Sequence, residues 1–378
     1  MKNKSLSGSS WRRALTIASA FVLCSQGALL AQQYQENDLV SDTLTENGNP
    51  PDPSLKNPWG IARGTGGPWW VSDNAGGVST LYNGSGIKQG LTVNIPHTAQ
   101  TMAGSPTGIV FNGSSDFAVS TGNPAIFIFA SFDGTISGWN PGVDLHNAIP
   151  KVTGSADSIL TGATIAQIGT KRYLYVADIR KGEITVYDTA FTAVELSEHA
   201  FHKDHVPKGF TPFNVQNIGN NLYVTYAKQN KTKTFVTFGN GLGYVDVFSP
   251  DGEFLMQLEH NDSLNAPWGL TLAPSDFGSF SRRVIVGEFG SGWISAFDAV
   301  TGEFIDNFKN STNGILTIVG PGALWALQFG DGEKNSDPLN QPANALFFTA
   351  GPFANGVFHG LFGTVTPLDS DLIQGSDQ

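Results

Sequence analysis

The chain has 378 residues, of which 40% are hydrophobic and only 14% charged, and its formal net charge is −11. This length fits one large all-β domain or two smaller ones. The excess of acidic residues argues against nucleic acid and anionic membranes as partners, because both reward clustered Lys and Arg. Glycine (45 residues) and phenylalanine (26 residues) are abundant, which favours many short strands joined by tight turns.

The first 31 residues have the layout of a secretory signal peptide. Four basic residues lie within the first 13 positions, and the apolar stretch ALTIASAFVLCSQGALLA follows. The small residues Ala31 and Ala28 are both possible cleavage positions for a signal peptidase. A retained membrane anchor is the alternative, but the polar residues 25–27 interrupt a run already short for a membrane span. We therefore expect an exported protein, periplasmic or extracellular, with no membrane span in the mature chain.

Cleavage changes both the redox chemistry and the charge of the chain. Cys24 is the single cysteine, so the mature protein would contain no disulfide and no cysteine-held metal. It would keep 17 Lys and Arg against 32 Asp and Glu, a formal charge of −15. Its stability must then come from its core.

A glycine-led hairpin recurs along the chain at intervals of about fifty residues. Each copy has a glycine, then a β-rich run that ends on an aromatic residue, and a turn residue follows. The six copies are GVSTLY from Gly77, GTISGW from Gly134, GEITVY from Gly182, GYVDVF from Gly243, GWISAF from Gly292 and the longer GVFHGLF from Gly356. Such internal repetition is typical of repeat architectures.

Two apolar strands precede each hairpin, and a weaker strand follows it. The first strands are predicted at PWGIA (58), PTGIV (106), TGATI (161), PFNVQ (212), PWGLT (267) and GALWAL (322), and the second strands at WWVSD (69), IFIFAS (126), YLYVAD (173), NLYVTY (221), RVIVGE (283) and ALFFTA (345). Six four-stranded sheets packed radially bury both faces of every sheet. We predict an all-β, NHL-like six-bladed β-propeller rather than a pair of β-sandwiches, which would not need six similarly spaced copies.

The last unit lacks a fourth strand. The extended segment YQENDLVSD, residues 34–42, is otherwise unassigned, and we predict that it forms the outer strand of the last blade. This pairing joins the two ends of the ring and removes an exposed edge. The predicted organisation is a signal peptide at 1–31, one propeller domain at 32–367 and a disordered tail at 368–378.

Propeller geometry brings two positions of every blade to one face, because the first strand begins and the second strand ends beside the central channel. The acids at the second-strand ends and the amides at the first-strand starts are Asp73, Asp178, Glu288, Asn57, Asn214 and Asn265. Their oxygens suit Ca²⁺, a hard cation that takes six to eight oxygen ligands. The alternative is that these residues cap turns before glycine.

Aromatic residues occupy equivalent places near four of the first-strand starts: Trp59, Phe213, Trp268 and Trp325. They can line the channel mouth as a stacking platform for a sugar or another flat ligand, or pack between blades. In the run EHAFHKDH, His199, His202 and His205 lie beside acids, which suits Zn²⁺. A surface loop is the alternative for this run.

Several segments resemble an uncharacterised family of exported bacterial NHL-like propeller proteins. The most specific are DLVSD…NPWGIA and PWGLTLAPSDFG, with WWVSDN, PTGIVFN, YLYVADI and GYVDVFSPDG between them, and the resemblance covers residues 38–367. Some members of that family have PEP-CTERM sorting tails, but this chain ends without the apolar helix and basic cluster of such a tail. The resemblance implies the fold and export, and it carries no activity.

Three functions are compatible with these observations. We favour a binding module that presents its channel face to a protein, glycan or small ligand. A Ca²⁺-dependent hydrolase or lyase, which a resemblance to gluconolactonase-type propellers implies, would use Asp73, Asp178 and Glu288 to hold the ion. A structural cell-surface or matrix protein is the third. The sequence contains no G-x-S-x-G, H-E-x-x-H, P-loop or dinucleotide-binding motif.

Overall fold

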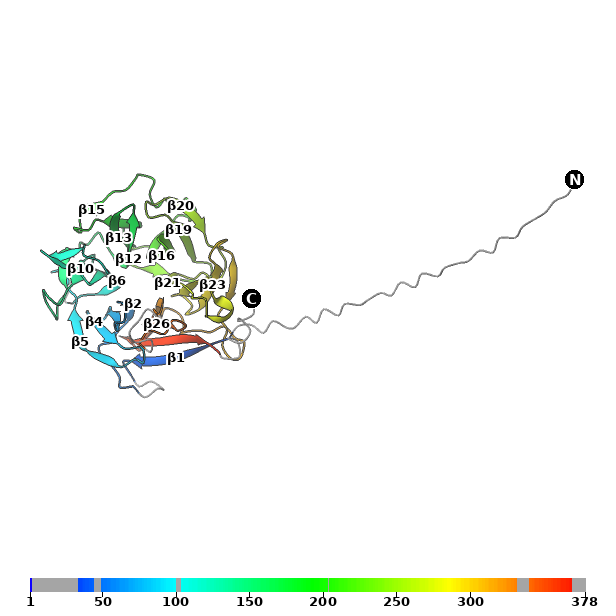
Figure 1. Cartoon of the computed structure of the whole chain (residues 1–378), viewed down its shortest axis with the longest axis horizontal. Helices are drawn as coiled ribbons and strands as arrows, with labels where there is room; N and C mark the ends of the chain where they lie inside the picture. Colours follow the sequence, from blue (N-terminus) through cyan, green and yellow to red (C-terminus); the bar gives the residue numbers. More distant parts are fainter. Residues whose placement is uncertain (2–32, 44–48, 100–102, 203, 332–339, 369–378) are drawn as a thin grey trace. The chain divides into compact units, whose positions relative to one another are not determined.

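The computed structural model describes Met1 and residues 33–43, 49–99, 103–202, 204–331 and 340–368. The unit Gln32–Gln378 contains six antiparallel sheets arranged in a ring, five of them with four strands and one with a short fifth strand (Figure 1). The protein is a six-bladed β-propeller, as the sequence predicts. Apart from Met1, the predicted signal peptide lies outside the described residues, and so does all but the first residue of the predicted tail.

Blades 1 to 5 run from inner to outer strand in chain order. Blade 1 is β2 (Pro58–Arg63), β3 (Trp69–Asp73), β4 (Val78–Tyr82) and β5 (Lys88–Asn94); blade 2 is β6 (Pro106–Phe111), β9 (Phe127–Ser131), β10 (Ile136–Trp139) and β11 (Ile149–Val152). Blade 3 is β12 (Leu160–Ile168), β13 (Lys171–Asp178), β14 (Glu183–Tyr187) and β15 (Ala193–Val194). Blade 4 is β16 (Phe210–Ile218), β17 (Asn221–Gln229), β19 (Gly243–Phe248) and β20 (Phe254–Gln257); blade 5 is β21 (Pro267–Leu272), β22 (Arg283–Glu288), β23 (Ile294–Asp298) and β24 (Phe304–Asn307).

Blade 6 combines the two ends of the propeller. Its strands are β25 (Leu324–Phe329), β26 (Leu346–Ala350), β29 (Leu361–Pro367) and, outermost, β1 (Tyr34–Ser41). β1 pairs antiparallel with β29, from Tyr34 opposite Pro367 to Ser41 opposite Leu361, with one bulge in between. The predicted closure of the ring by an N-terminal strand is confirmed.

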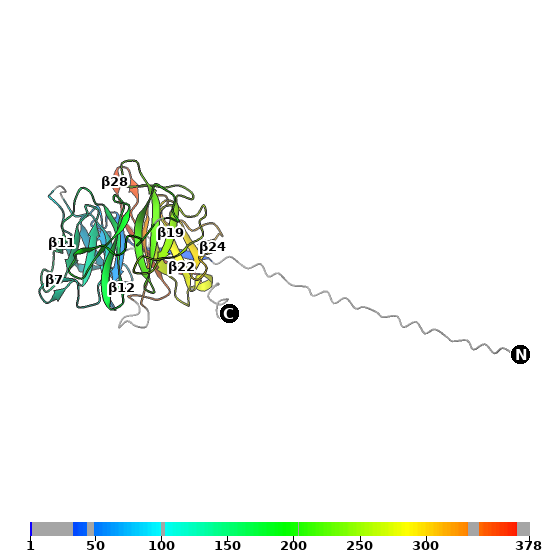
Figure 2. The same ribbon diagram turned by 90° about the horizontal axis from the view of Figure 1, so that it is seen from above.

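Short accessory elements decorate the blades. β7 (Ala118–Ser120) and β8 (Asn123–Pro124) form a small hairpin in blade 2, and a 3-10 turn covers Gly278–Phe280 in blade 5. β18 (Val236–Thr237) pairs with β17 in blade 4. β27 (Phe353–Ala354) and β28 (Val357–Phe358) form a hairpin that stands at one face of the propeller (Figure 2).

The β27–β28 hairpin corrects one detail of the repeat. The sixth motif, GVFHGLF, was predicted to be the third strand of its blade, but its first half lies in β28 and the third strand, β29, begins only at Leu361. The extra residue of this copy reflects the insertion. The hairpin therefore adds side chains to the channel face that the other blades do not supply.

The inner strands approach one another closely around the channel. Each of the six has a β-bulge near its start. A Cβ added at Gly108 would lie 2.6 Å from the Ala163 backbone nitrogen of the next blade, and one at Gly269 would lie 2.5 Å from the Trp325 carbonyl oxygen. Glycine at these positions permits the close approach. Between the inner strands the channel keeps a cavity of only about 30 Å³.

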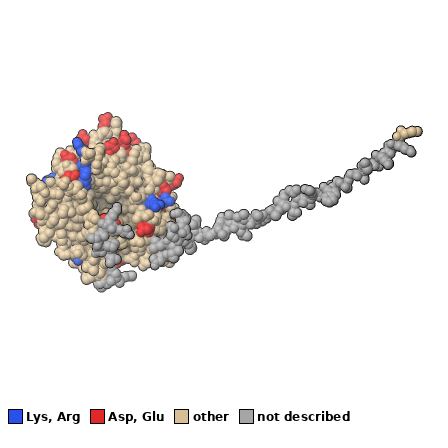
Figure 3. Space-filling view, viewed as in Figure 1, with Lys and Arg blue, Asp and Glu red and all other residues tan. Residues whose placement is uncertain are grey.

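The described residues form no large basic patch on the face that Figure 3 draws. On the face drawn in Figure 3, the described Lys and Arg side chains form small separate groups rather than one basic patch. This distribution agrees with the acidic balance of the chain. Within the part of the chain that the structure describes, no helix has the length and hydropathy needed to cross a bilayer.

Candidate binding site at the channel mouth

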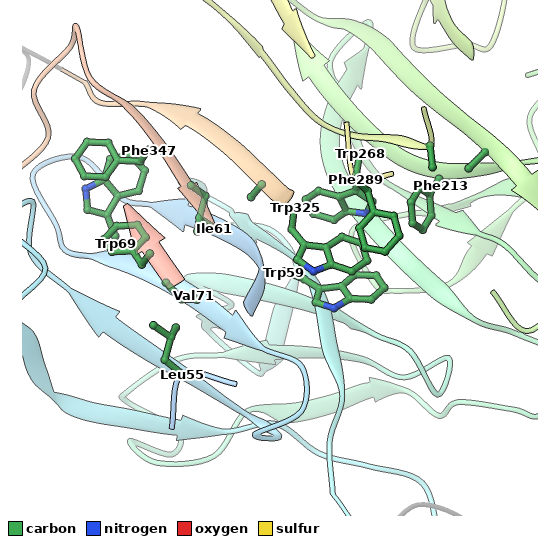
Figure 4. Close-up of a cluster of buried hydrophobic side chains, with 14 of the residues drawn as sticks. Leu55, Trp59, Ile61, Trp69, Val71, Phe213, Trp268, Phe289, Trp325 and Phe347 are labelled. Atoms are coloured by element: carbon green, nitrogen blue, oxygen red, sulfur yellow. The ribbon is translucent and has the colours of Figure 1, made fainter. Parts of the chain in front are cut away.

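Four aromatic side chains meet in the centre of the ring and plug the channel. Trp59 and Trp325 stack with ring centroids 3.6 Å apart, and Trp268 and Phe213 lie 5.8 and 5.9 Å from Trp325 (Figure 4). They come from blades 1, 6, 5 and 4, and each is at most 4% exposed. These are the four aromatics that the sequence places near the first-strand starts. They fill the channel instead of lining an open one.

A pocket of about 500 Å³ lies against this plug. Its lining residues come from five of the six blades and their connections: Asn57, Trp59, Asn74, Ser105, Phe132, Phe235, Phe238, Phe289, Pro321, Gly322, Trp325, Gly351, Phe353 and Phe358. Eight of these fourteen residues are aromatic, and none is charged. Of the predicted binding residues, Trp59, Trp325 and Asn57 line the pocket, whereas Phe213 and Trp268 lie within the plug.

The walls of the pocket are held in edge-to-face contacts. Phe289 meets Phe235 at 5.9 Å and 83°, and Phe238 at 5.7 Å and 90°. The rim is open to solvent, because Phe353 and Phe358 of the β27–β28 hairpin are 60% and 41% exposed. Exposed aromatic rings of this kind are characteristic of binding surfaces rather than of core.

Many wall residues share one place in the repeat, directly after the second strand. Asn74 follows β3, Phe132 follows β9, Phe289 follows β22 and Gly351 follows β26. Successive side chains of an extended chain point in opposite directions, so the residue before each of these points away from the channel. The sequence prediction selected that preceding residue. A prediction that took the next residue of each blade would have identified these residues of the pocket wall.

One edge of the pocket is polar. Asn57 Oδ1 accepts a hydrogen bond from Trp325 Nε1 at 3.2 Å, and Asn57 Nδ2 donates to Asn74 Oδ1 at 3.2 Å. Asn74 Nδ2 donates in turn to the Ser105 carbonyl oxygen at 3.2 Å. This chain of amides fixes the side chains of blade 1 against blades 2 and 6. It gives an otherwise apolar pocket one hydrogen-bonding wall.

The other two predicted amides have structural roles. Asn214 Nδ2 donates to the Trp268 carbonyl oxygen at 2.7 Å, which ties the inner strands of blades 4 and 5 together. Asn265 Oδ1 accepts from the Gly239 backbone nitrogen at 2.6 Å. Both side chains are buried, and neither lines the pocket.

The structure does not bring Asp73, Asp178 and Glu288 together. Each carboxylate is fully buried and accepts hydrogen bonds within its own blade. Asp73 accepts from Thr80, Asp178 from the backbone of 159, 180 and 181, and Glu288 from the backbone nitrogen of Asn265 at 2.8 Å. Among the described residues, no three His, Cys, Asp or Glu side chains are grouped to hold a metal ion.

The three acids thus form no shared Ca²⁺ cage, because strand alternation turns each of them away from the channel at the end of its second strand, before the hairpin glycine. Burial has a second consequence. It raises the pKa of Glu288 to about 8 and the pKa of Asp73 well above its usual value. A carboxyl group held protonated in this way is a poor ligand for a cation.

Chelation is expected to leave the folded protein unchanged. Because the three acids take their hydrogen-bond partners from their own blades, EDTA should not lower the melting temperature of the mature protein. A melting curve recorded with and without EDTA, together with metal analysis of the untreated protein, checks this. Stoichiometric calcium accompanied by a fall in melting temperature would contradict it and would restore the predicted cation site.

The described residues of the histidine-rich run, 198–202, 204 and 205, lie in the connection between β15 of blade 3 and β16 of blade 4. His199 Nε2 lies 3.3 Å from Glu198 Oε1, and His202 Nδ1 lies 3.3 Å from Asp204 Oδ2. His205 stacks on Phe254 with centroids 3.7 Å apart. Among the described residues, the three histidines are not part of any group of side chains that could hold a metal ion. The surface-loop interpretation therefore describes this segment better than the zinc interpretation.

Comparison with known proteins identifies relatives of unassigned activity. No protein-family model matches the chain. Uncharacterized protein R648 of Acanthamoeba polyphaga mimivirus is 30% identical over 344 residues, which cover 88% of this chain and 80% of that protein. The chain belongs to the same family. Uncharacterized protein R640 of the same virus is 34% identical over 225 residues, 57% of this chain, and the chain covers only 41% of its length.

A solved structure supports the fold. A protein of unknown function from Bacteroides thetaiotaomicron VPI-5482 superposes with a TM-score of 0.53 at 12% identity, over 88% of this chain and 76% of that chain. At this identity the likeness concerns the fold alone. The resemblance to propeller proteins is confirmed at that level, and the sequence relatives of the family reported above are viral.

Proposed function

We propose that the protein is an exported binding module that takes a small ligand into the aromatic pocket beside the plugged channel. The observation that carries the proposal is the pocket itself. Its volume of about 500 Å³ lies within the range of small-ligand sites, which are concave, largely apolar and carry a few placed polar groups. Export rests on the signal peptide predicted at residues 1–31. The pocket's size favours a small ligand over a protein or a long glycan.

The chemistry of the lining favours binding over catalysis. General acid–base catalysis needs a group such as His, Asp, Glu, Lys or Tyr within reach of the substrate. None of these residue types is among the fourteen that line the pocket. Ser105 carries a hydroxyl group, but no base among the lining residues is present to activate it.

Replacing a rim phenylalanine is expected to weaken binding without unfolding the protein. Phe353→Ser removes a ring that is already 60% exposed, so little packing is lost. We expect about a fivefold loss of affinity for an uncharged naphthalene-sized probe, because one aromatic contact contributes about 1 kcal/mol. Titration calorimetry measures the dissociation constants.

Phe254→Ser is the matched control. Phe254 is an exposed phenylalanine of β20, at the outer edge of blade 4, and it does not line the pocket. Its replacement should leave the affinity unchanged. Absence of saturable binding by the wild-type protein, or equal losses in the two variants, would oppose the proposed site.

A further inference from the structure

We infer that the ligand of this pocket is an uncharged, flat molecule with a hydrogen-bond acceptor for the indole N–H of Trp59. The inference rests on the proposed function and specifies its ligand class. Three properties of the described residues carry it: the absence of charge from the lining, the arrangement of the rings, and a buried donor without an acceptor.

The lining excludes a charged ligand. None of its fourteen residues is Asp, Glu, Lys, Arg or His. An ion transferred into such a site would lose hydration and gain no opposite charge, which is strongly unfavourable. An uncharged ligand loses much less hydration free energy when it enters the pocket.

The rings of the pocket suit a flat ligand. Phe132, Phe235 and Phe289 form successive tilted or edge-to-face pairs. The Trp59 and Trp325 rings stack 17° from parallel (Figure 4). Aromatic rings pair best by offset stacking or by edge-to-face contact. A planar π-system can make either contact with these walls, whereas a branched aliphatic group can make neither.

The Trp59 indole N–H is a buried donor that has no acceptor among the described residues, and Trp59 itself is 2% exposed. The indole N–H groups of Trp268 and Trp325, in the same plug, have hydrogen-bond acceptors. Trp268 Nε1 donates to the Thr161 carbonyl oxygen at 3.0 Å, and Trp325 Nε1 donates to Asn57 Oδ1 at 3.2 Å. A buried donor left unpaired is destabilising, so such groups call for an explanation. A ligand acceptor at the Trp59 side of the pocket would remove that cost.

Three naphthalenes of equal ring size test the inference: naphthalene, 2-acetylnaphthalene and 2-naphthoate. The acetyl compound adds a carbonyl acceptor, and the naphthoate adds a charge. We expect 2-acetylnaphthalene to bind about fivefold more tightly than naphthalene, which corresponds to one net hydrogen bond, and 2-naphthoate to bind most weakly. Titration calorimetry on the full mature protein gives the three dissociation constants.

Trp59→Phe is the decisive variant. It keeps an aromatic ring at the stack and removes the N–H, so the preference for 2-acetylnaphthalene over naphthalene should disappear. Trp268→Phe removes an N–H from the same plug but outside the pocket, and it should keep the preference. The two variants also differ in stability: Trp268→Phe leaves the Thr161 carbonyl oxygen without its donor and should melt at a lower temperature than Trp59→Phe.

The outcomes separate the two claims. If no probe binds the wild-type protein, the proposed function fails and the inference fails with it. If naphthalene binds but the acetyl group brings no gain, or the gain survives in Trp59→Phe, only the inference is overturned. Tightest binding by 2-naphthoate would overturn the uncharged class. Equal melting temperatures of the two variants would show that the Trp59 N–H already has a partner in the fold.

Discussion

Replacement of Tyr34 by alanine is expected to lower the free energy of unfolding by about 3–5 kcal/mol, the range for deleting a buried aromatic side chain. Tyr34 begins β1, the strand that closes the ring, and it is 1% exposed. Its ring lies 4.2 Å from Phe308, 5.1 Å from Phe277 and 5.5 Å from Phe280. The variant therefore loses the ring contacts that hold the N-terminal strand of blade 6 against blade 5.

Tyr34→Phe separates packing from hydrogen bonding. The Tyr34 hydroxyl donates to the Phe277 carbonyl oxygen at 3.1 Å in a buried position. Its removal should cost about 1 kcal/mol, the usual net value of a hydrogen bond. Urea unfolding followed by tryptophan fluorescence measures both variants. A loss below about 1 kcal/mol in Tyr34→Ala would mean that β1 contributes little to the closed ring, against the pairing described here.

The fold could be predicted from sequence because its signals are local and repeated. A glycine such as Gly182, at a φ of 76°, marks the hairpin, and the aromatic that ends the run fixes the strand register. The closure of the ring could be predicted because the last unit lacked a fourth strand and the extended segment 34–42 had no other partner. The sixth copy was harder, because the β27–β28 hairpin interrupts the repeat with two short strands.

The site was predicted only in part, for a geometric reason. Trp59 and Trp325 were found because inner-strand starts must converge at the channel. Asp73 and Glu288 stand one position before the residues that face it, and a shift by one residue reverses the face in a strand. Phe235 and Phe238 flank β18, an accessory strand outside the repeat. Periodicity could not place them, because their position depends on tertiary contacts with blade 5.

Raising the pH is expected to destabilise the protein through Glu288. Burial raises the pKa of this carboxyl group from its usual 4.5 to about 8 in the fold. Between these values the folded chain keeps a proton that the unfolded chain has released, so the free energy of unfolding falls as the pH rises from about 4.5 and levels off above 8. The expected loss from this group is on the order of 3–5 kcal/mol. Burial also raises the pKa of Glu36 to about 7 and that of Asp246 to about 6, which adds slopes of the same sign.

Glu288→Gln should remove the part of the slope between pH 5 and pH 8 that Glu288 supplies, and the slopes from Asp73, Glu36 and Asp246 should remain. Glutamine has the shape of the protonated acid, and its Oε1 can still accept from the Asn265 backbone nitrogen, now 2.8 Å from a Glu288 oxygen. Glu253→Gln, at an exposed position, is the control and should keep the wild-type profile. Urea unfolding at a series of pH values supplies the comparison. If Glu288→Gln follows the wild-type curve, the carboxylate is charged inside blade 5, and a bound cation would then be the group needed to hold it there.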